Sequence, residues 1–295
     1  MTESKINLEE LYGYLSEIGS KILSGELEVE SIPQFTRNKI DINNKLSILH
    51  NFTEIVHIKE KAMMKTIEDV WLYDFLDGSN SSFIAPAYHL NQYLDLLEEF
   101  NIYNLNKGYN DELDLIKYKF SVEVHNLFFS IKSLLDRLVA IFSFYYPGIQ
   151  LKTTFGRMVN KKPSGLMSKV NELKDKDDLM AYIYEEYFNW IQSAVSPRDL
   201  VTHYNDLGIR QHSTIDGRII PYHVERVILQ NNKKFLVVGE EMDDDLLDDL
   251  IPNEFTYKDL IGYVNHLYEF LHYVFEKLKD KDFKSKRVKS EIPME

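Results

Sequence analysis

Residues 111–148 read DELDLIKYKFSVEVHNLFFSIKSLLDRLVAIFSFYYPG and contain the longest regular pattern in the chain. Apolar residues recur there every three or four positions: Leu113, Ile116, Phe120, Val124, Leu127, Ile131, Leu134, Leu138, Ile141 and Tyr145. This spacing places them on one face of a single long amphipathic helix. Pro147-Gly148 ends the helix, because proline cannot continue the backbone hydrogen bonds. The fold is therefore predicted to be mainly α.

Weaker helical patterns lie on both sides of this segment. They cover residues 5–24, the stretch from Arg37 to Ile58, a helix opened by Pro86 and ending near Phe100, residues 176–194, and Phe255 to Leu278. The polar run Asp77–Ser82 predicts a loop before Pro86. Two apolar runs, Ile219–Leu229 and Phe235–Val238, are joined by Gln230–Lys233 and predict a β-hairpin.

The chain has 295 residues, which suits one large domain or two small ones. Asn104–Asn110, which contains Lys107-Gly108, is the predicted boundary. It separates an acidic N-terminal helical region, residues 1–105, from a helical bundle, residues 106–290. Within the bundle we expect a basic connector at residues 148–175 and the β-hairpin at residues 215–240.

Composition excludes several classes of protein. The chain has no cysteine, which rules out disulfide scaffolds, cysteine–zinc sites, thiol catalysis and iron–sulfur clusters. The N-terminus lacks the apolar stretch of a signal peptide, and Lys132, Asp136 and Arg137 interrupt the longest apolar run. No glycine-rich phosphate loop and no metalloprotease or hydrolase motif occurs. We expect a cytoplasmic protein with no membrane contact, metal or cofactor.

Charge is distributed unevenly along the chain. The formal net charge is −13, and residues 1–100 hold 17 acids against 8 bases. The basic connector, in contrast, has bases and no acid between Ile149 and Asn171. Lys152, Arg157, Lys161 and Lys162 are therefore candidate contacts to an RNA backbone, with Phe155 as a ring on which a base stacks. The alternative is a solvated loop.

The sequence Ser196-Pro197-Arg198-Asp199 has the features of a helix start. Arg198 would stand beside free backbone amides at the positive end of the helix dipole, which suits a phosphate. His203, five residues further on, can take or give a proton near neutral pH. Together they supply the groups needed to cleave RNA without metal: a base or acid, and a cation for the charge of the transition state.

Helical geometry adds a condition to this candidate site. Five residues turn an ideal helix so that Arg198 and His203 point about 140° apart. Either the first turn is irregular, or a symmetric dimer completes the site from two copies. Arg210 and His212, just past Gly208, would extend the RNA-contacting rim, although loop residues of this kind are commonly solvated.

The segment Arg198-Asp199-Leu-Val-Thr-His203 resembles the R-x(4–6)-H signature of HEPN domains (higher eukaryotes and prokaryotes nucleotide-binding). Ser133-Leu-Leu-Asp-Arg-Leu138 on the long helix is also similar to the first core helix of that family. The resemblance covers about residues 108–280. It implies a helical bundle, a homodimer, and a metal-independent endoribonuclease of toxin or phage-defence systems that a protein partner neutralises. By the family pattern Arg198 and His203 are catalytic, and Asp199 supports them.

Three hypotheses follow. The first is RNA cleavage by Arg198 and His203 in a dimer cleft of a HEPN-like bundle with an inserted β-hairpin. The second is a non-catalytic HEPN module that binds a nucleotide, RNA or a protein partner. The third is a structural dimerising bundle in which both residues form ion pairs. Asp136 is expected either to be the buried partner of an arginine or to be exposed on the far side of the long helix. The acidic run 240–249 is expected to be a solvated loop or a flap that competes with RNA.

Overall fold

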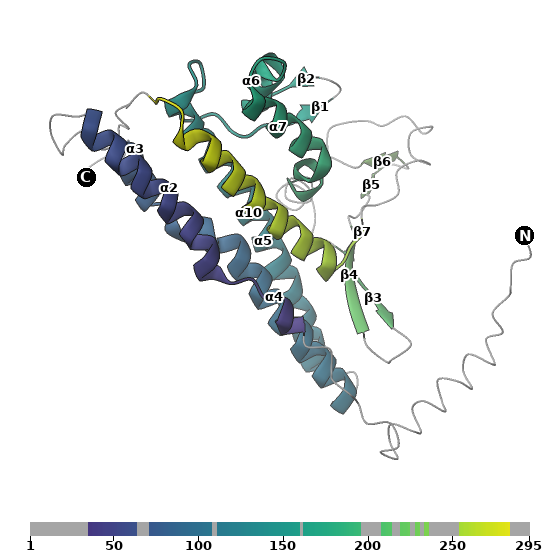
Figure 1. Ribbon diagram of the computed structural model, residues 1–295. Coiled ribbons are helices and arrows are strands. Elements are labelled where there is room, and N and C mark those ends of the chain that lie inside the picture. The colour runs from purple at the N-terminus through teal and green to yellow at the C-terminus, as the bar shows by residue number, and fades with distance from the viewer. Residues whose placement is uncertain are drawn as a thin grey trace, which may run out of the picture.

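The computed structural model describes residues 35–63, 71–107, 111–159, 162–195, 208–213, 219–224, 228–230, 233–235 and 254–283 (Figure 1). Long helices dominate this part of the chain and run alongside one another: α2 (Ile42–Met63), α4 (Asn80–Lys107), α5 (Asp111–Tyr145) and α10 (Tyr257–Lys279). The predicted mainly α class is confirmed. The predicted helix at residues 5–24 lies outside the described residues.

Shorter elements complete the described fold. The short helices are η1 (Phe35–Asn38), α3 (Trp71–Asp77), α6 (Leu166–Leu173) and α7 (Asp178–Glu186), which continues into the π-helical turn η3 (Tyr187–Ile191). The strands are β1 (Met158–Val159), β2 (Lys162–Pro163), β3 (Gly208–Ser213), β4 (Ile219–Val224), β5 (Ile228–Gln230), β6 (Lys233–Phe235) and β7 (Glu254–Phe255).

Helices α4 and α5 pack against each other in antiparallel directions. The His89 Nδ1 atom lies 2.8 Å from the Glu123 carboxylate, and the Tyr93 and Phe120 rings are 5.3 Å apart. Buried residues on both helices belong to one hydrophobic cluster that extends from Phe35 to Phe283. The boundary predicted at residues 104–110 begins inside α4 and ends just before α5, and these two helices share a core.

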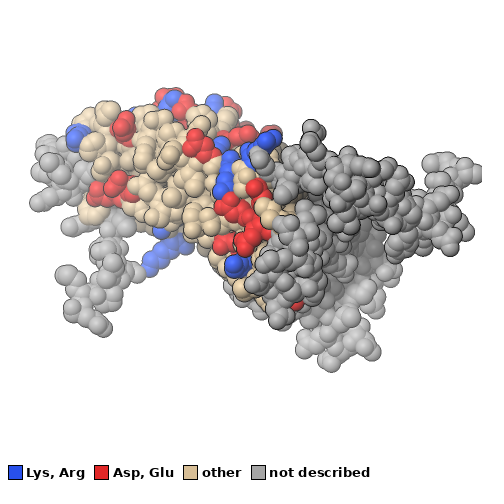
Figure 2. All heavy atoms as spheres, turned by 90° about the horizontal axis from the view of Figure 1, so that it is seen from below, with Lys and Arg blue, Asp and Glu red and all other residues tan. Residues whose placement is uncertain are grey.

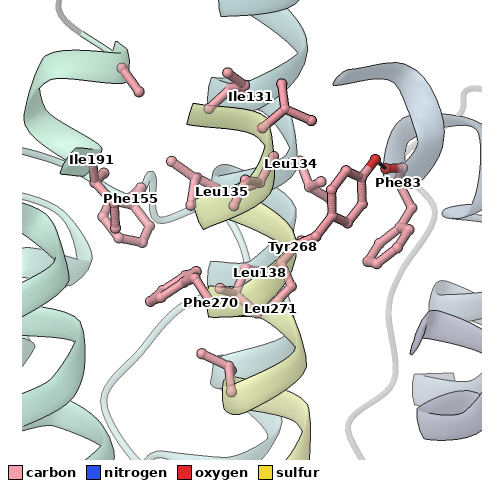
Figure 3. Packing of buried hydrophobic residues seen from close by; sticks show 14 of the residues in the cluster. Phe83, Ile131, Leu134, Leu135, Leu138, Phe155, Ile191, Tyr268, Phe270 and Leu271 are labelled. Carbon is pink, nitrogen blue, oxygen red and sulfur yellow. Dashed lines mark hydrogen bonds between the residues drawn. The ribbon is translucent and has the colours of Figure 1, made fainter. Parts of the chain in front are cut away.

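Helix α10 lies in the middle of this core (Figure 3). Its first turn is fixed by a capping box, in which the Thr256 hydroxyl accepts from the Lys258 amide and the Asp259 carboxylate accepts from the Thr256 amide. Tyr268 points to α4, where its hydroxyl donates to the Phe83 carbonyl at 2.7 Å. Phe270, on another face of the helix, points toward the side where Phe155 and Ile191 lie.

The loop predicted at Asp77–Ser82 is wrong in its second half. Helix α4 begins at Asn80, includes Pro86 in its second turn, and runs to Lys107 rather than to Phe100. Pro86 has no N–H to donate to the Ser82 carbonyl, which ordinarily disfavours an internal position. The helix forms nevertheless because Phe83, on the N-terminal side of Pro86, is buried in the core together with Ala87 and Leu90.

The basic connector is more ordered than the predicted loop. It contains the antiparallel pair β1–β2, in which Met158 is opposite Pro163, and the helix α6. Phe155, the predicted base-stacking ring, is 0% exposed and belongs to the core cluster. That prediction is wrong, because burial of the ring removes more apolar surface from water than an exposed stacking position would.

The strands beyond residue 208 pair in an arrangement different from the one predicted. The run Ile219–Leu229 is divided between β4 and β5. Strand β4 pairs antiparallel with β3 and with β7, and β5 pairs with β6 with Ile228 opposite Phe235. Strand β3 could not be recognised from its sequence, because Gly208-Ile-Arg-Gln-His-Ser213 has a single strongly β-forming residue.

Candidate nucleic-acid interface

The structure describes some of the predicted site residues and not others. Arg198, Asp199, His203 and Lys161 lie outside the described residues, as does the acidic run 240–249. Arg210, His212 and Lys162 are placed by their backbone alone, with Arg210 opposite Tyr222 and His212 opposite Ile220. Lys152 and Arg157 are described completely, and both are exposed.

A groove lies on the solvent side of α5, where the start of the basic connector crosses the helix. It has a volume of about 540 Å³. Its lining residues are Phe129, Lys132, Ser133, Asp136, Arg137 and Ala140 from α5, Phe75 from α3, and Leu151, Lys152, Thr153 and Thr154 from the connector. We call this feature the α5 groove. Of the RNA contacts predicted on the connector, Lys152 lines it and Arg157 does not.

Asp136 holds the two walls of the α5 groove together. Its Oδ1 atom lies 2.6 Å from the Lys132 Nζ atom, one helical turn earlier, and accepts from the Phe155 amide, also at 2.6 Å. The carboxylate therefore fixes both a cation and the start of the buried connector. This corrects both readings of Asp136: its partner is a lysine rather than an arginine, and its side chain is one-third exposed.

Arg137 is oriented by the turn between α3 and α4. Its guanidinium donates to the Ser79 hydroxyl at 3.2 Å, and that hydroxyl donates to the Phe75 carbonyl at 2.6 Å. A guanidinium has five N–H donors, so this one hydrogen bond leaves donors for a ligand in the groove. The backbone around residues 75–79 thus positions a cation on α5.

The electrostatics of the α5 groove differ from those of the whole chain. The charged lining residues are three cations, Lys132, Arg137 and Lys152, and one carboxylate, Asp136, which gives a local formal charge of +2. The full chain carries −13. On the face of the described part seen in Figure 2, acidic and basic residues lie side by side and no single sign dominates. The positive character is therefore local, which suits short-range contacts to phosphate rather than long-range attraction.

Sequence reasoning missed most of this groove. Lys132, Asp136 and Arg137 were named there as charges that interrupt the apolar run, and Asp136 also as a possible partner of an arginine, but none of them as part of a binding site. The signal that links them to Lys152 is the hydrogen bond between Asp136 and the Phe155 amide. Contacts of this kind between distant segments have no local pattern in the sequence.

A second polar cluster joins the ends of three helices. The Tyr146 hydroxyl donates to Asp177 at 3.1 Å, and the Lys281 Nζ atom lies 2.6 Å from the same carboxylate. Asp177 also caps α7 by accepting from the Leu179 and Met180 amides. Burial and the neighbouring Asp177 charge raise the pKa of Tyr146 well above its usual range. The cluster is accounted for by its structural role, since it fixes the ends of α5 and α10 to the start of α7.

This cluster gives a pH-dependent prediction. Burial by itself raises the pKa of Asp177, but hydrogen bonds from Lys281, the Met180 amide and Tyr146 outweigh it and lower the pKa below its ordinary value. A lowered carboxyl pKa contributes stability that is present above the unfolded-state pKa of about 4 and is lost as pH falls through the folded-state pKa. Urea unfolding below about pH 4 should therefore show a steeper loss of stability for the wild type than for Asp177→Asn. Asparagine keeps the helix cap, so equal pH slopes would contradict the assignment.

Comparison with known proteins does not assign this chain to a family. No protein-family model, no curated protein and no solved structure matches it. Among the described residues, no helix combines the length and apolar character that crossing a bilayer needs. The same residues contain no group of three or more histidine, aspartate or glutamate side chains that could hold a metal ion.

Proposed function

We propose that this protein binds single-stranded RNA through the α5 groove and cleaves it as a metal-independent endoribonuclease of HEPN type, with Arg198 and His203 as catalytic residues. The observation that supports binding is the convergence of Lys132, Arg137 and Lys152 on one groove of a strongly acidic chain. The support for cleavage is the sequence Ser196-Pro-Arg-Asp, followed by His203. The two halves of the proposal rest on different residues and are tested separately.

The α5 groove has the chemistry of a nucleotide site. Arginine forms paired hydrogen bonds with phosphate oxygens, and lysine supplies a compact charge beside them. Phe129, at 37% exposure, borders the same groove, so an aromatic ring lies beside the cations, a combination typical of grooves that bind single-stranded RNA. Phosphate contacts of this kind carry little sequence information, so the groove suits RNA positioning more than sequence recognition.

Cleavage would follow the chemistry of the two catalytic side chains. His203 removes the proton of a 2′-hydroxyl, the 2′-oxygen attacks the adjacent phosphorus, and the bond to the 5′-oxygen breaks. The departing 5′-oxygen takes a proton from a protonated histidine, and the products are a 2′,3′-cyclic phosphate and a 5′-hydroxyl. Arg198 stabilises the charge that grows on the phosphorane oxygens, and Asp199 supports the pair. In a homodimer, two copies would bring Arg198 and His203 into one cleft.

A second candidate function is a non-catalytic module that holds RNA or a nucleotide. The α5 groove favours it, because every residue that lines the groove lies outside the R-x(4–6)-H segment. On this reading the protein binds without cleaving, and a protein partner uses the complex. The structural-bundle hypothesis, in which Arg198 and His203 form ion pairs, predicts neither binding nor cleavage.

The binding half is tested by charge reversal. Arg137→Glu with Lys152→Glu should weaken binding of a fluorescein-labelled single-stranded RNA about 10- to 100-fold in anisotropy titrations, because two charge-assisted phosphate contacts are lost. This pair leaves Lys132–Asp136 intact. The control is Lys61→Glu with Lys258→Glu, which makes the same change in net charge at two exposed lysines away from the groove. Equal weakening by both pairs would contradict a site in the α5 groove.

The cleavage half is tested with the full chain and an RNA panel in the presence of chelator. Arg198→Ala and His203→Ala should each lower the cleavage rate by about 10²-fold or more while RNA affinity stays within about twofold. RNA that is bound but never cut would overturn the nuclease and leave the binding module. Cleavage that survives His203→Ala would overturn the catalytic assignment.

A further inference from the structure

Three apolar side chains in the first half of α5 face solvent. Leu115 is 54% exposed, Tyr118 72% and Val122 54%. Their intervals of three and four residues place them on one side of the helix over about 10 Å, at roughly 1.5 Å per residue. The opposite side of the same turns is buried in the core through Phe120 and Val124. These three residues, which we call the α5 row, therefore form a second apolar face on a helix whose first face is already covered.

Residues 5–24 have the same apolar spacing. The sequence predicts an amphipathic helix there, and this segment lies outside the described residues. An amphipathic helix needs a surface on which to bury its apolar side. Two helices whose apolar residues alternate at intervals of three and four pack side by side with interlocking side chains. The α5 row has this alternation, and so have the apolar residues of the segment: Leu8, Leu11, Leu15, Ile18 and Ile22.

The chain enters the described structure level with the α5 row. The Thr36 amide and hydroxyl both donate to the Glu98 carboxylate on α4, at 3.2 and 2.8 Å. Two residues after Glu98, the Phe100 ring lies 5.5 Å from the ring of Phe120, which stands within the span of the α5 row. The ten residues 25–34 can extend over about 33 Å, whereas the axes of packed helices are about 8–10 Å apart. The predicted helix can therefore reach the outer side of α5.

We infer that the α5 row is the docking surface of residues 5–24 of the same chain, which pack against α5 as a further helix of the bundle. Three side chains are too small a surface for a separate protein, because a standard interface needs about 800 Å² per partner. A segment joined through a short linker has an effective concentration on the order of millimolar, so a small apolar contact holds it. The docking does not depend on RNA binding, since the α5 groove is lined by later residues of α5.

The first experiment uses the absence of cysteine from the chain. Val122→Cys introduces the only thiol into the full-length protein, and a thiol reagent should modify it about tenfold or more slowly than the thiol of Ile58→Cys, because a docked helix leaves it open for only a small fraction of the time. Leu11→Gln with Leu15→Gln should restore fast modification of Val122→Cys. Glutamine keeps the helical propensity of leucine and removes its apolar contact. Ile58 is the matched control, since it is 68% exposed on α2.

Three results of this experiment would overturn the inference. The first is a Val122→Cys thiol that reacts as fast as that of Ile58→Cys. The second is protection that Leu11→Gln with Leu15→Gln leaves unchanged, which would assign the α5 row to another cover. The third is protection that increases with protein concentration, which would assign it to a contact between chains. Circular dichroism of each variant should keep the wild-type helical signal, so that faster modification reports undocking rather than unfolding.

A second experiment locates the docked segment by disulfide cross-linking. Tyr118→Cys is combined in turn with cysteine at each of the five apolar positions of residues 5–24. Mild oxidation should link at least one of these pairs within a single chain, because a disulfide forms only where the Cα atoms come within about 7 Å. Glu10→Cys and Glu17→Cys, on the opposite side of the predicted helix, are the controls and should not link to Tyr118→Cys. Linkage at none of the apolar positions, or equal linkage at Glu10 and Glu17, would contradict a helix seated on the α5 row.

Discussion

Replacing Phe155 by alanine will lower the free energy of unfolding by about 3–5 kcal/mol, the usual cost of deleting a fully buried phenylalanine ring. The ring is 0% exposed, and Figure 3 places it beside Ile191, on the side of the core that α10 covers with Phe270. The backbone on both sides of the ring is hydrogen-bonded, through the Phe155 amide to Asp136 and through the Phe155 carbonyl to the Met167 amide. The surrounding backbone therefore cannot move easily to fill the cavity that removal of the ring would leave.

Urea unfolding followed by circular dichroism measures this cost. Phe155→Leu is the matched control, since it keeps most of the apolar volume and should lose about 1.5 kcal/mol or less. The RNA affinity of Phe155→Ala should fall only to the extent that the connector unfolds. A Phe155→Ala variant that unfolds at the wild-type urea concentration but binds RNA more weakly would contradict the burial of the ring and would favour the base-stacking role.

The helices show how far sequence reasoning reaches. The limits of α5 were predictable because one apolar period continues from Leu113 to Tyr145, and Pro147-Gly148 must end it. Helix α10 was predicted to within two residues at each end. Helix α4 was mispredicted at its start, because Asp77–Ser82 is rich in turn-forming residues and Pro86 suggests a first turn. Burial of Phe83 outweighs both local signals.

The candidate site shows where sequence reasoning ends. Lys152 was singled out from composition, and the structure places it in a groove with Arg137 and Lys132. Phe155 was singled out by the same reasoning and is buried. The difference depends on which side of the connector faces α5, and that is decided by the Asp136 carboxylate, 19 residues earlier in the chain. Apolar and polar residues alternate along the connector over too short a stretch to predict which side chains face α5.

The connector also has a backbone requirement that leads to the second large effect. Gly156 has a φ of +79°, and a Cβ atom there would lie 1.9 Å from the Ser164 carbonyl oxygen and 2.9 Å from the Gly165 Cα atom. These are backbone atoms, so no side-chain rotation relieves the overlap. The neighbouring backbone is held by hydrogen bonds from the Ser164 amide to Arg157 and from the Leu166 amide to Thr154. A side chain at position 156 must separate these two segments.

Gly156→Ala should therefore destabilise the protein by about 3 kcal/mol or more, through strain and overlap together. Gly148→Ala is the matched control: its φ is +91°, but no atom lies within 4 Å of its Cβ position, so it should cost only about 1–2 kcal/mol of backbone strain. Gly262→Ala, in the open middle of α10, should stabilise by about 0.5–1 kcal/mol. Urea midpoints of the three variants give this order directly. A Gly156→Ala variant no less stable than Gly148→Ala would show that the connector does not pack against itself as described, and the position of Lys152 in the α5 groove would lose its structural basis.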